Sequence, residues 1–253
     1  MTTANGTPDP TTQPLRDRVI LVTGAGDGIG RATALACARA GATLVLLGKT
    51  IPKLEAVYDE IESCGAPQPA IYPMNLEGAS VRDHEDLAAT LEREFGRLDG
   101  LVHNAAMLGP LSPIAHYDVE SWFRVLQVNL NAPFLLTRAL LGLLNASQDA
   151  SVVFLSDRVG RRGRAYWGAY GVSKAGIEAL MQILADELEE NTPIRVNSYA
   201  PGAVRTGLRR NAYPAEDPDR NPEPEAVVGP LLYLLGPESR GITGRQFDIS
   251  DFD

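Results

Sequence analysis

The chain has 253 residues, 44% of them apolar, and carries a formal net charge of −9 at pH 7. This acidic balance argues against nucleic acid or an anionic membrane surface as a partner. The longest apolar runs, such as Val152–Leu155, are far too short to span a membrane. The start of the chain lacks the pattern of a secretory signal, and Cys37 and Cys64 lack metal-ligand spacing. We therefore expect a cytoplasmic protein without a metal site.

Short apolar runs alternate with helical patterns along the chain. Residues 1–15, rich in Thr and Pro, are expected to form a disordered tail before a single domain over 16–253. Strands are expected at 18–23, 42–47, 69–74, 99–103, 150–156, 194–199 and 245–249. Helices are expected at 28–40, 51–63, 78–95, 118–145, 166–190 and 224–236. This alternation predicts a Rossmann-type α/β fold, a doubly wound parallel sheet of about seven strands with helices on both faces.

Several polar or glycine-rich features fall where predicted strands end. They are a glycine-rich turn after the first strand, Asn104, the pair Ser156-Asp157, and Pro201-Gly202. In an open α/β sheet, ligands bind at this carboxyl edge. The stretches Met107–Pro113 and Pro201–Pro224 are expected to be loops at the same edge, the second either a substrate lid or a surface segment.

The turn from Thr23 to Gly30 joins the first predicted strand to the first predicted helix. Its glycines permit a tight turn and a close approach of the backbone to a pyrophosphate, and the helix N-terminus offers amide groups to that anion. The spacing Gly24-x-x-x-Gly28-x-Gly30 differs from the G-x-G-x-x-G of other dinucleotide domains. Its position in the first strand–helix unit predicts a dinucleotide site.

Lys49 ends the second predicted strand, in a segment without an acidic residue. A carboxylate at this point would accept a hydrogen bond from the ribose 2′-hydroxyl of NAD. A lysine would instead attract the 2′-phosphate of NADP. The residue therefore favours NADP(H), while an ordinary exposed lysine would leave NAD(H) open.

Tyr170 and Lys174 stand four residues apart, so on a helix they share one face. An ammonium near a phenol favours the phenolate and lowers the phenol pKa. The pair can then act as an acid and base nearer to neutral pH. Together with the glycine-rich turn, it indicates a nucleotide-dependent oxidoreductase.

These motifs resemble the classical short-chain dehydrogenase/reductase family over about residues 16–250. The resemblance rests on the glycine-rich turn, Tyr170-x-x-x-Lys174, His103–Ala106, Asn129 and Pro201-Gly202. Three further stretches are similar to the YciK-like branch of bacterial short-chain oxidoreductases: Gly160–Tyr170, Leu46–Lys49 and Tyr213–Pro218.

The resemblance implies a hydride transfer between NADP(H) and a small carbonyl or alcohol substrate. Tyr170 would exchange a proton with the substrate oxygen, Lys174 would bind the nicotinamide ribose, and Asn129 would hold a water linked to Lys174. With position 157, these form the implied catalytic set. The implied cofactor-binding set is Gly24, Gly26, Asp27, Gly28, Ile29, Gly30, Lys49, Asn75, Leu76, Asn104, Ala105, Ala106, Tyr170, Lys174, Pro201, Gly202, Val204 and Thr206.

Asp157 is the main departure from the family pattern, which places a serine thirteen residues before the tyrosine. A serine hydroxyl donates to the substrate oxygen, whereas an ionised aspartate only accepts and raises the pKa of Tyr170. The arginines of 158–164 are expected to keep Asp157 ionised. Three outcomes stay open: a substrate whose own amine or hydroxyl pairs with Asp157, a reductase that uses Ser156 or a water, or a non-catalytic NADP(H)-binding or regulatory protein.

The segment Leu135–Leu144 is apolar around nearly its whole circumference, more than one buried stripe requires. In the family that it resembles, helices at 118–145 and 166–190 commonly pair between subunits. We therefore expect a homodimer or homotetramer.

Overall fold

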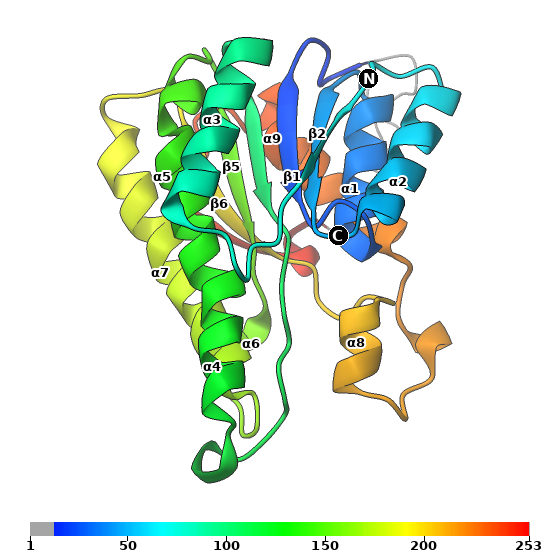
Figure 1. The fold of residues 1–253 in the computed structure, drawn as a ribbon, viewed down its shortest axis with the longest axis vertical. Helices are drawn as coiled ribbons and strands as arrows, with labels where there is room; N and C mark the ends of the chain where they lie inside the picture. Colours follow the sequence, from blue (N-terminus) through cyan, green and yellow to red (C-terminus); the bar gives the residue numbers. More distant parts are fainter. Residues whose placement is uncertain (1–12, 253) are drawn as a thin grey trace.

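The computed structural model describes residues 13–252, which form one seven-stranded sheet in the order β3-β2-β1-β4-β5-β6-β7. All neighbouring strands pair in parallel. The strands are β1 (Val19–Thr23), β2 (Thr43–Gly48), β3 (Ala70–Pro73), β4 (Gly100–His103), β5 (Ser151–Leu155), β6 (Arg195–Ala200) and β7 (Gln246–Asp248). The predicted fold class is confirmed (Figure 1).

Helices cover both faces of the sheet (Figure 1). On one face lie α3 (Val81–Phe95), α5 (Ala132–Asn145) and α7 (Gly168–Glu189), and on the other α1 (Gly28–Arg39), α2 (Ile51–Ser63) and α9 (Gly229–Leu235). Successive strand residues point to opposite faces, so Val19 and Leu21 pack under the first set of helices, and Ile20 and Val22 under the second. This two-sided burial explains why the strand sequences read as continuous apolar runs.

The helix expected over 118–145 is interrupted. It consists of α4 (Val119–Leu126), a π-helical turn (Gln127–Asn131) and α5. Pro133 lies in the first turn of α5 and has no N–H to donate to the carbonyl of Asn129, so the regular hydrogen-bond ladder cannot pass through this point.

The stretch Pro201–Pro224 is not a structureless loop, as the sequence had suggested. It contains α8 (Gly207–Ala212), at the edge where the strands end (Figure 1), and a 3₁₀ turn at Pro218–Arg220. Thr206 caps α8 by accepting from the N–H of Arg209 across 3.2 Å. The helix expected over 224–236 begins as a 3₁₀ turn (Pro224–Val227), since Gly229 and Pro230 start α9. The short helix α6 (Arg158–Arg161) was not expected, and the remaining 3₁₀ turns are Ile114–His116, Pro237–Ser239 and Ile249–Phe252.

Most of the predicted N-terminal tail, residues 1–12, lies outside the described residues. Leu15, assigned to that tail, is fully buried, and its N–H donates to the carbonyl of Ala40 across 3.0 Å. Within residues 13–252, no helix combines the length and apolar character that a membrane span requires.

Candidate active site

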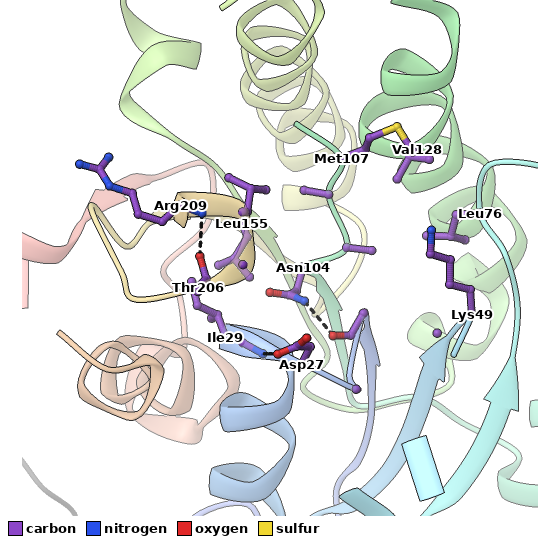
Figure 2. A pocket seen from close by; sticks show the side chains of 18 of the residues that line it. Asp27, Ile29, Lys49, Leu76, Asn104, Met107, Val128, Leu155, Thr206 and Arg209 are labelled. Atoms are coloured by element: carbon purple, nitrogen blue, oxygen red, sulfur yellow. Dashed lines mark hydrogen bonds between the residues drawn. The ribbon is translucent and has the colours of Figure 1, made fainter. Parts of the chain in front are cut away.

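A cleft of about 610 Å³ runs along the carboxyl ends of the central strands. Figure 2 shows Lys49 and Leu76 bordering one side, and Thr206 and Arg209 the other. Every residue of the predicted site lines this cleft except Gly30 and Asn129, which lie behind its wall. Lining residues to which the sequence assigned no individual role include Lys53, Met107, Trp167, Leu208 and Arg209.

The glycine-rich turn has the geometry that its sequence predicts. Gly24 and Gly28 have φ of 65° and 51°, in the left-handed region that favours glycine. A Cβ on Gly30 would lie 2.2 Å from the carbonyl oxygen of Gly24 and 2.3 Å from Nδ2 of Asn104. Gly30 therefore permits close packing behind the turn, and the cradle in front of it stays open for a pyrophosphate.

Asp27 caps helix α1 at the same turn. Its Oδ1 accepts from the N–H of Gly28 across 2.8 Å, and its Oδ2 pairs with Lys53. The hydrogen bond from Lys53 lowers the pKa of Asp27. Lys53 thus offsets a negative charge that would otherwise oppose an anion at the helix N-terminus.

Asn104 ties the end of β4 to the end of β1. Its side-chain amide donates to the carbonyl of Thr23 across 2.8 Å, and its backbone N–H donates to the Thr23 hydroxyl across 3.0 Å. The N–H of Ala105 donates to that same hydroxyl across 3.0 Å. The side chain of Asn104 is therefore occupied in shaping the cleft.

Lys49 follows β2, is exposed, and forms no ion pair with any residue between 13 and 252. Asn75, which follows β3, uses its Oδ1 to accept from the N–H of Glu77 across 3.3 Å. The adenosine end of the cleft thus offers an unpaired ammonium and a neutral amide. These groups fit a phosphorylated adenosine ribose better than a free ribose, which a carboxylate would bind.

Tyr170 and Lys174 lie on α7, and both are almost fully buried. The Tyr170 hydroxyl donates to Oδ2 of Asp157 across 3.2 Å. Nζ of Lys174 donates to the carbonyl oxygen of Leu155 across 2.6 Å and lies 5.7 Å from the centroid of the Tyr170 ring. The predicted acid/base pair, Tyr170 and Lys174, therefore lies together on α7 with Asp157 beside it.

The expectation of a lowered pKa for Tyr170 is not met in this arrangement, because burial and Asp157 outweigh any effect of Lys174. Burial raises the pKa of Tyr170 well above its usual value, and the charge and hydrogen bond of Asp157 raise it further. Burial also lowers the pKa of Lys174 to about 8, against the charges of Asp157 and Glu178. Tyr170 is consequently a neutral phenol at neutral pH and carries the proton that a substrate oxygen would receive.

Asp157 uses its two carboxylate oxygens separately. Oδ1 caps α6 by accepting from the N–H of Val159 across 3.0 Å, and Oδ2 faces Tyr170. Ser156 beside it is buried, and its Oγ has no hydrogen-bond partner within the described part of the chain.

Among the described residues no arginine forms an ion pair with Asp157, although Arg158 interacts with it electrostatically. Arg158 binds both oxygens of Asp248, at 2.8 and 2.6 Å. Arg161 binds Glu178 across 3.0 Å and the carbonyl of Phe247 across 2.8 Å. These bonds attach α6 to α7 and β7, because Glu178 lies on α7 and the other two acceptors lie in β7.

Asn129 lies in the π-helical turn and is buried. Its side chain accepts from the N–H of Met107 across 2.7 Å, and donates to the carbonyl of Met107 across 2.8 Å and to Oγ of Ser173 across 3.1 Å. These contacts fix the loop after β4 against α7. The water between Asn129 and Lys174 stays a prediction.

The aromatic side chains of Trp167 and Tyr170 line the cleft beside Asp157, and Tyr213 packs against Trp167. The ring of Trp167 lies 5.6 Å from that of Tyr170 and 6.1 Å from that of Tyr213, centroid to centroid. Arg209 stacks on Tyr213 at 3.9 Å and binds Glu216 through two hydrogen bonds of 2.7 and 2.6 Å. Nothing in the local sequence indicated this cluster, because its members come from α7 and from the segment around α8.

Comparison with known proteins places the cleft in context. The family described as short chain dehydrogenase matches residues 18–217. The uncharacterized oxidoreductase YciK of Escherichia coli (strain K12) is 44% identical over 234 residues, covering 92% of each chain. A solved protein from Pseudomonas syringae is 53% identical with a TM-score of 0.94, covering 96% of this chain and 98% of its own. A protein of Escherichia coli CFT073 solved in complex with NADPH is 45% identical with a TM-score of 0.91, covering 94% and 99%.

Proposed function

Because the chain belongs to the short-chain dehydrogenase family, we propose that it is an NADP(H)-dependent oxidoreductase acting on a small carbonyl or alcohol. The observation that carries this proposal is the buried Tyr170 hydroxyl, which lies in the cleft with Lys174 and Asp157 beside it. A phenol in this position can exchange a proton with a substrate oxygen.

The cofactor proposal rests on the adenosine end of the cleft. Lys49 supplies a cation without an ion-pair partner within residues 13–252, and the glycine-rich turn leaves room for a pyrophosphate. A 45% identical relative binds NADPH. NAD(H) is the alternative cofactor, and it would gain nothing from Lys49.

When bound, the nicotinamide supplies or accepts the hydride. In the reducing direction, Tyr170 donates its proton to the substrate oxygen as negative charge develops there. The Lys174 ammonium next to the ring stabilises the phenolate that remains. Asn129 and Asn104 hold the loop after β4, which forms the floor of the reaction site.

NADPH oxidation against a panel of ketones, aldehydes, quinones and diketones tests this function. Wild-type protein should oxidise NADPH with at least one of them, and Tyr170→Phe should lower kcat by at least about 10³-fold while NADPH binding is retained. Tyr166→Phe, which removes the hydroxyl of an exposed tyrosine, is the matched control. An active Tyr170→Phe variant would contradict the proposed role.

A non-catalytic NADP(H)-binding or regulatory protein is the second candidate. The observation that favours it is Asp157, an acceptor that holds the Tyr170 hydroxyl. Both candidates bind NADPH, so turnover separates them. A protein that binds NADPH but turns over no panel member, with or without Asp157→Ser, would support the second.

We also propose that the protein is a cytoplasmic homodimer or homotetramer. Helices α4, α5 and α7 expose large apolar side chains, including Val119, Phe123, Phe134 and Ile183. A surface of this kind is typical of an interface between subunits.

A further inference from the structure

We propose that Asp157 selects substrates with a hydroxyl on the carbon next to the reacting one, that is, α-hydroxy ketones and the vicinal diols formed from them. The proposal rests on the proposed function and names the substrate class of the same cleft. It starts from the two bonds of Asp157: Oδ1 is used by the N–H of Val159, and Oδ2 accepts from the Tyr170 hydroxyl across 3.2 Å.

When the Tyr170 hydroxyl donates to a substrate oxygen, its hydrogen bond to Oδ2 of Asp157 is lost. The Tyr170 hydroxyl has one hydrogen, so it cannot donate to a substrate oxygen and to Oδ2 together. Oδ2 of the partly buried Asp157 then loses its protein donor, which costs free energy. A simple ketone has no donor to offer, and its oxygen, as it gains negative charge, is repelled by the carboxylate.

A hydroxyl on the neighbouring carbon resolves both problems. The two oxygens of an α-hydroxy ketone lie about as far apart as hydrogen-bonded oxygens, similar to the 3.2 Å between the Tyr170 and Asp157 oxygens. The carbonyl oxygen can therefore take the position facing Tyr170, while the hydroxyl donates to Oδ2. The bond to a charged acceptor is stronger than a neutral hydrogen bond.

A neutral hydroxyl fits this place better than an ammonium. Lys174 is buried nearby and interacts electrostatically with Asp157, so the carboxylate already has a cation beside it. Arg209 also lines the cleft. A second cation close to Lys174 would add repulsion that a hydroxyl avoids.

The surroundings of Asp157 suit a substrate with two oxygens on a hydrocarbon frame. Trp167 lines the cleft and provides an aromatic surface against which C–H groups can pack, and Tyr213 packs against Trp167. Ser156 lines the same cleft, and its buried Oγ lacks a partner among the described residues. The cleft thus combines an apolar wall, one charged acceptor and one spare hydroxyl.

Asp157 neither gains nor loses a proton during the proposed reaction. The carbonyl carbon receives a hydride from the reduced nicotinamide that the proposed function supplies, and the carbon–oxygen π bond breaks. The oxygen takes the proton of Tyr170, and the phenolate regains a proton from solvent. The product is a vicinal diol, and the nicotinamide is left oxidised.

The test compares 2-hydroxycyclohexanone with cyclohexanone as substrates of the full-length wild-type protein and of two variants. Asp157→Ser and Asp157→Asn both keep a residue that can cap α6. Wild type should show at least about tenfold higher kcat/KM for the hydroxy ketone. Asp157→Ser should lose that preference and reduce cyclohexanone faster than wild type. Equal use of the two ketones by wild type, or an unchanged preference in Asp157→Ser, would overturn the proposal.

A binding measurement keeps the proposal testable if neither ketone is reduced. Calorimetry on protein saturated with NADP⁺ should show trans-1,2-cyclohexanediol binding at least about tenfold more tightly than cyclohexanol, and Asp157→Ser should remove this difference. If no ketone turns over but the diol difference is present, the oxidoreductase function fails and the recognition by Asp157 stands. No difference between the two alcohols, or tighter binding of 2-aminocyclohexanol than of the diol, would overturn the hydroxyl assignment.

Discussion

The Tyr170 hydroxyl and the Asp157 carboxylate share one hydrogen bond of 3.2 Å, and this contact determines how the site responds to pH. Both burial and the carboxylate raise the pKa of Tyr170 well above its usual value. The phenol therefore keeps its proton through the neutral range. The protonated form that carbonyl reduction needs is therefore present at neutral pH, while the phenolate that alcohol oxidation needs is scarce.

We predict opposite pH profiles for the two directions of the reaction. Alcohol oxidation needs the phenolate, so its rate should rise about tenfold per pH unit from pH 7 to 9. Carbonyl reduction needs the phenol and should change little between pH 6 and 8. Asp157→Ser removes a charge that raises the pKa of Tyr170, so its oxidation profile should move to lower pH. Initial rates in both directions measure this, and an identical oxidation profile in the variant would count against the link.

Lys49 should control the choice of cofactor. Lys49→Ala should weaken NADPH binding about tenfold, because a charge-assisted contact to the 2′-phosphate is lost, and should leave NADH binding unchanged. Fluorescence titration of the bound nicotinamide gives both constants. Arg93→Ala, an exposed cation near the far end of α3, is the control. Equal losses for NADPH and NADH would show that Lys49 does not contact the phosphate.

His103 should make the fold sensitive to acid. Burial lowers the pKa of His103 to about 3, and its Nε2 lies 2.8 Å from the Thr137 hydroxyl. The unfolded chain binds the proton near pH 6.5 and the folded chain does not, so stability falls as pH drops from about 6.5 toward 3. Between pH 6 and 5, wild type should lose about 1 kcal/mol more than His103→Asn.

Urea unfolding at the two pH values checks this prediction. The window lies above the usual pKa range of Asp and Glu, so carboxylates with lowered pKa, such as that of Asp248, contribute little to the change. Parallel loss of stability in wild type and His103→Asn would exclude the buried histidine as the cause.

The exposed apolar side chains of α4 and α5 should mediate self-association. Light scattering should give a mass of two or four times 27.2 kDa for wild type, and the double variant Phe123→Asp with Phe134→Asp should be a monomer. Both phenylalanines are substantially exposed, at 65% and 49%. Ile51→Asp, on α2 across the sheet, should leave the mass unchanged. A monomeric wild type would contradict the predicted assembly.

The local sequence pattern was sufficient to predict the sheet and the edge of the sheet at which the cleft lies. All seven strands of the sheet were expected near their observed positions, most clearly where the run is continuously apolar, as in β1 and β2. The glycine-rich turn, Asn104 and Asp157 line the cleft at the edge where parallel strands end, as the sequence indicated. The sequence did not predict the interruption between α4 and α5, which depends on the missing N–H of Pro133. It also did not predict the short helix α8, which depends on the side-chain cap of Thr206.

The partners of the charged residues could not be predicted in the same way. Arg158 reaches Asp248 across 90 positions of sequence, and Arg161 reaches Glu178 on α7. The sequence placed the arginines of 158–164 near Asp157 but did not show which acids they bind, because ion pairing depends on tertiary placement. The pKa of Tyr170 was missed in direction for the same reason, because the extent of burial is not visible in the spacing of Tyr170 and Lys174.

Hydrogen bonds from Arg158 and Arg161 attach α6 to β7. Asp157, which faces Tyr170, directly precedes α6, so the last strand of the sheet helps to hold Asp157 in place. A substitution at Asp248 would remove the acceptor of Arg158 and loosen α6, and would thereby change substrate preference from outside the cleft.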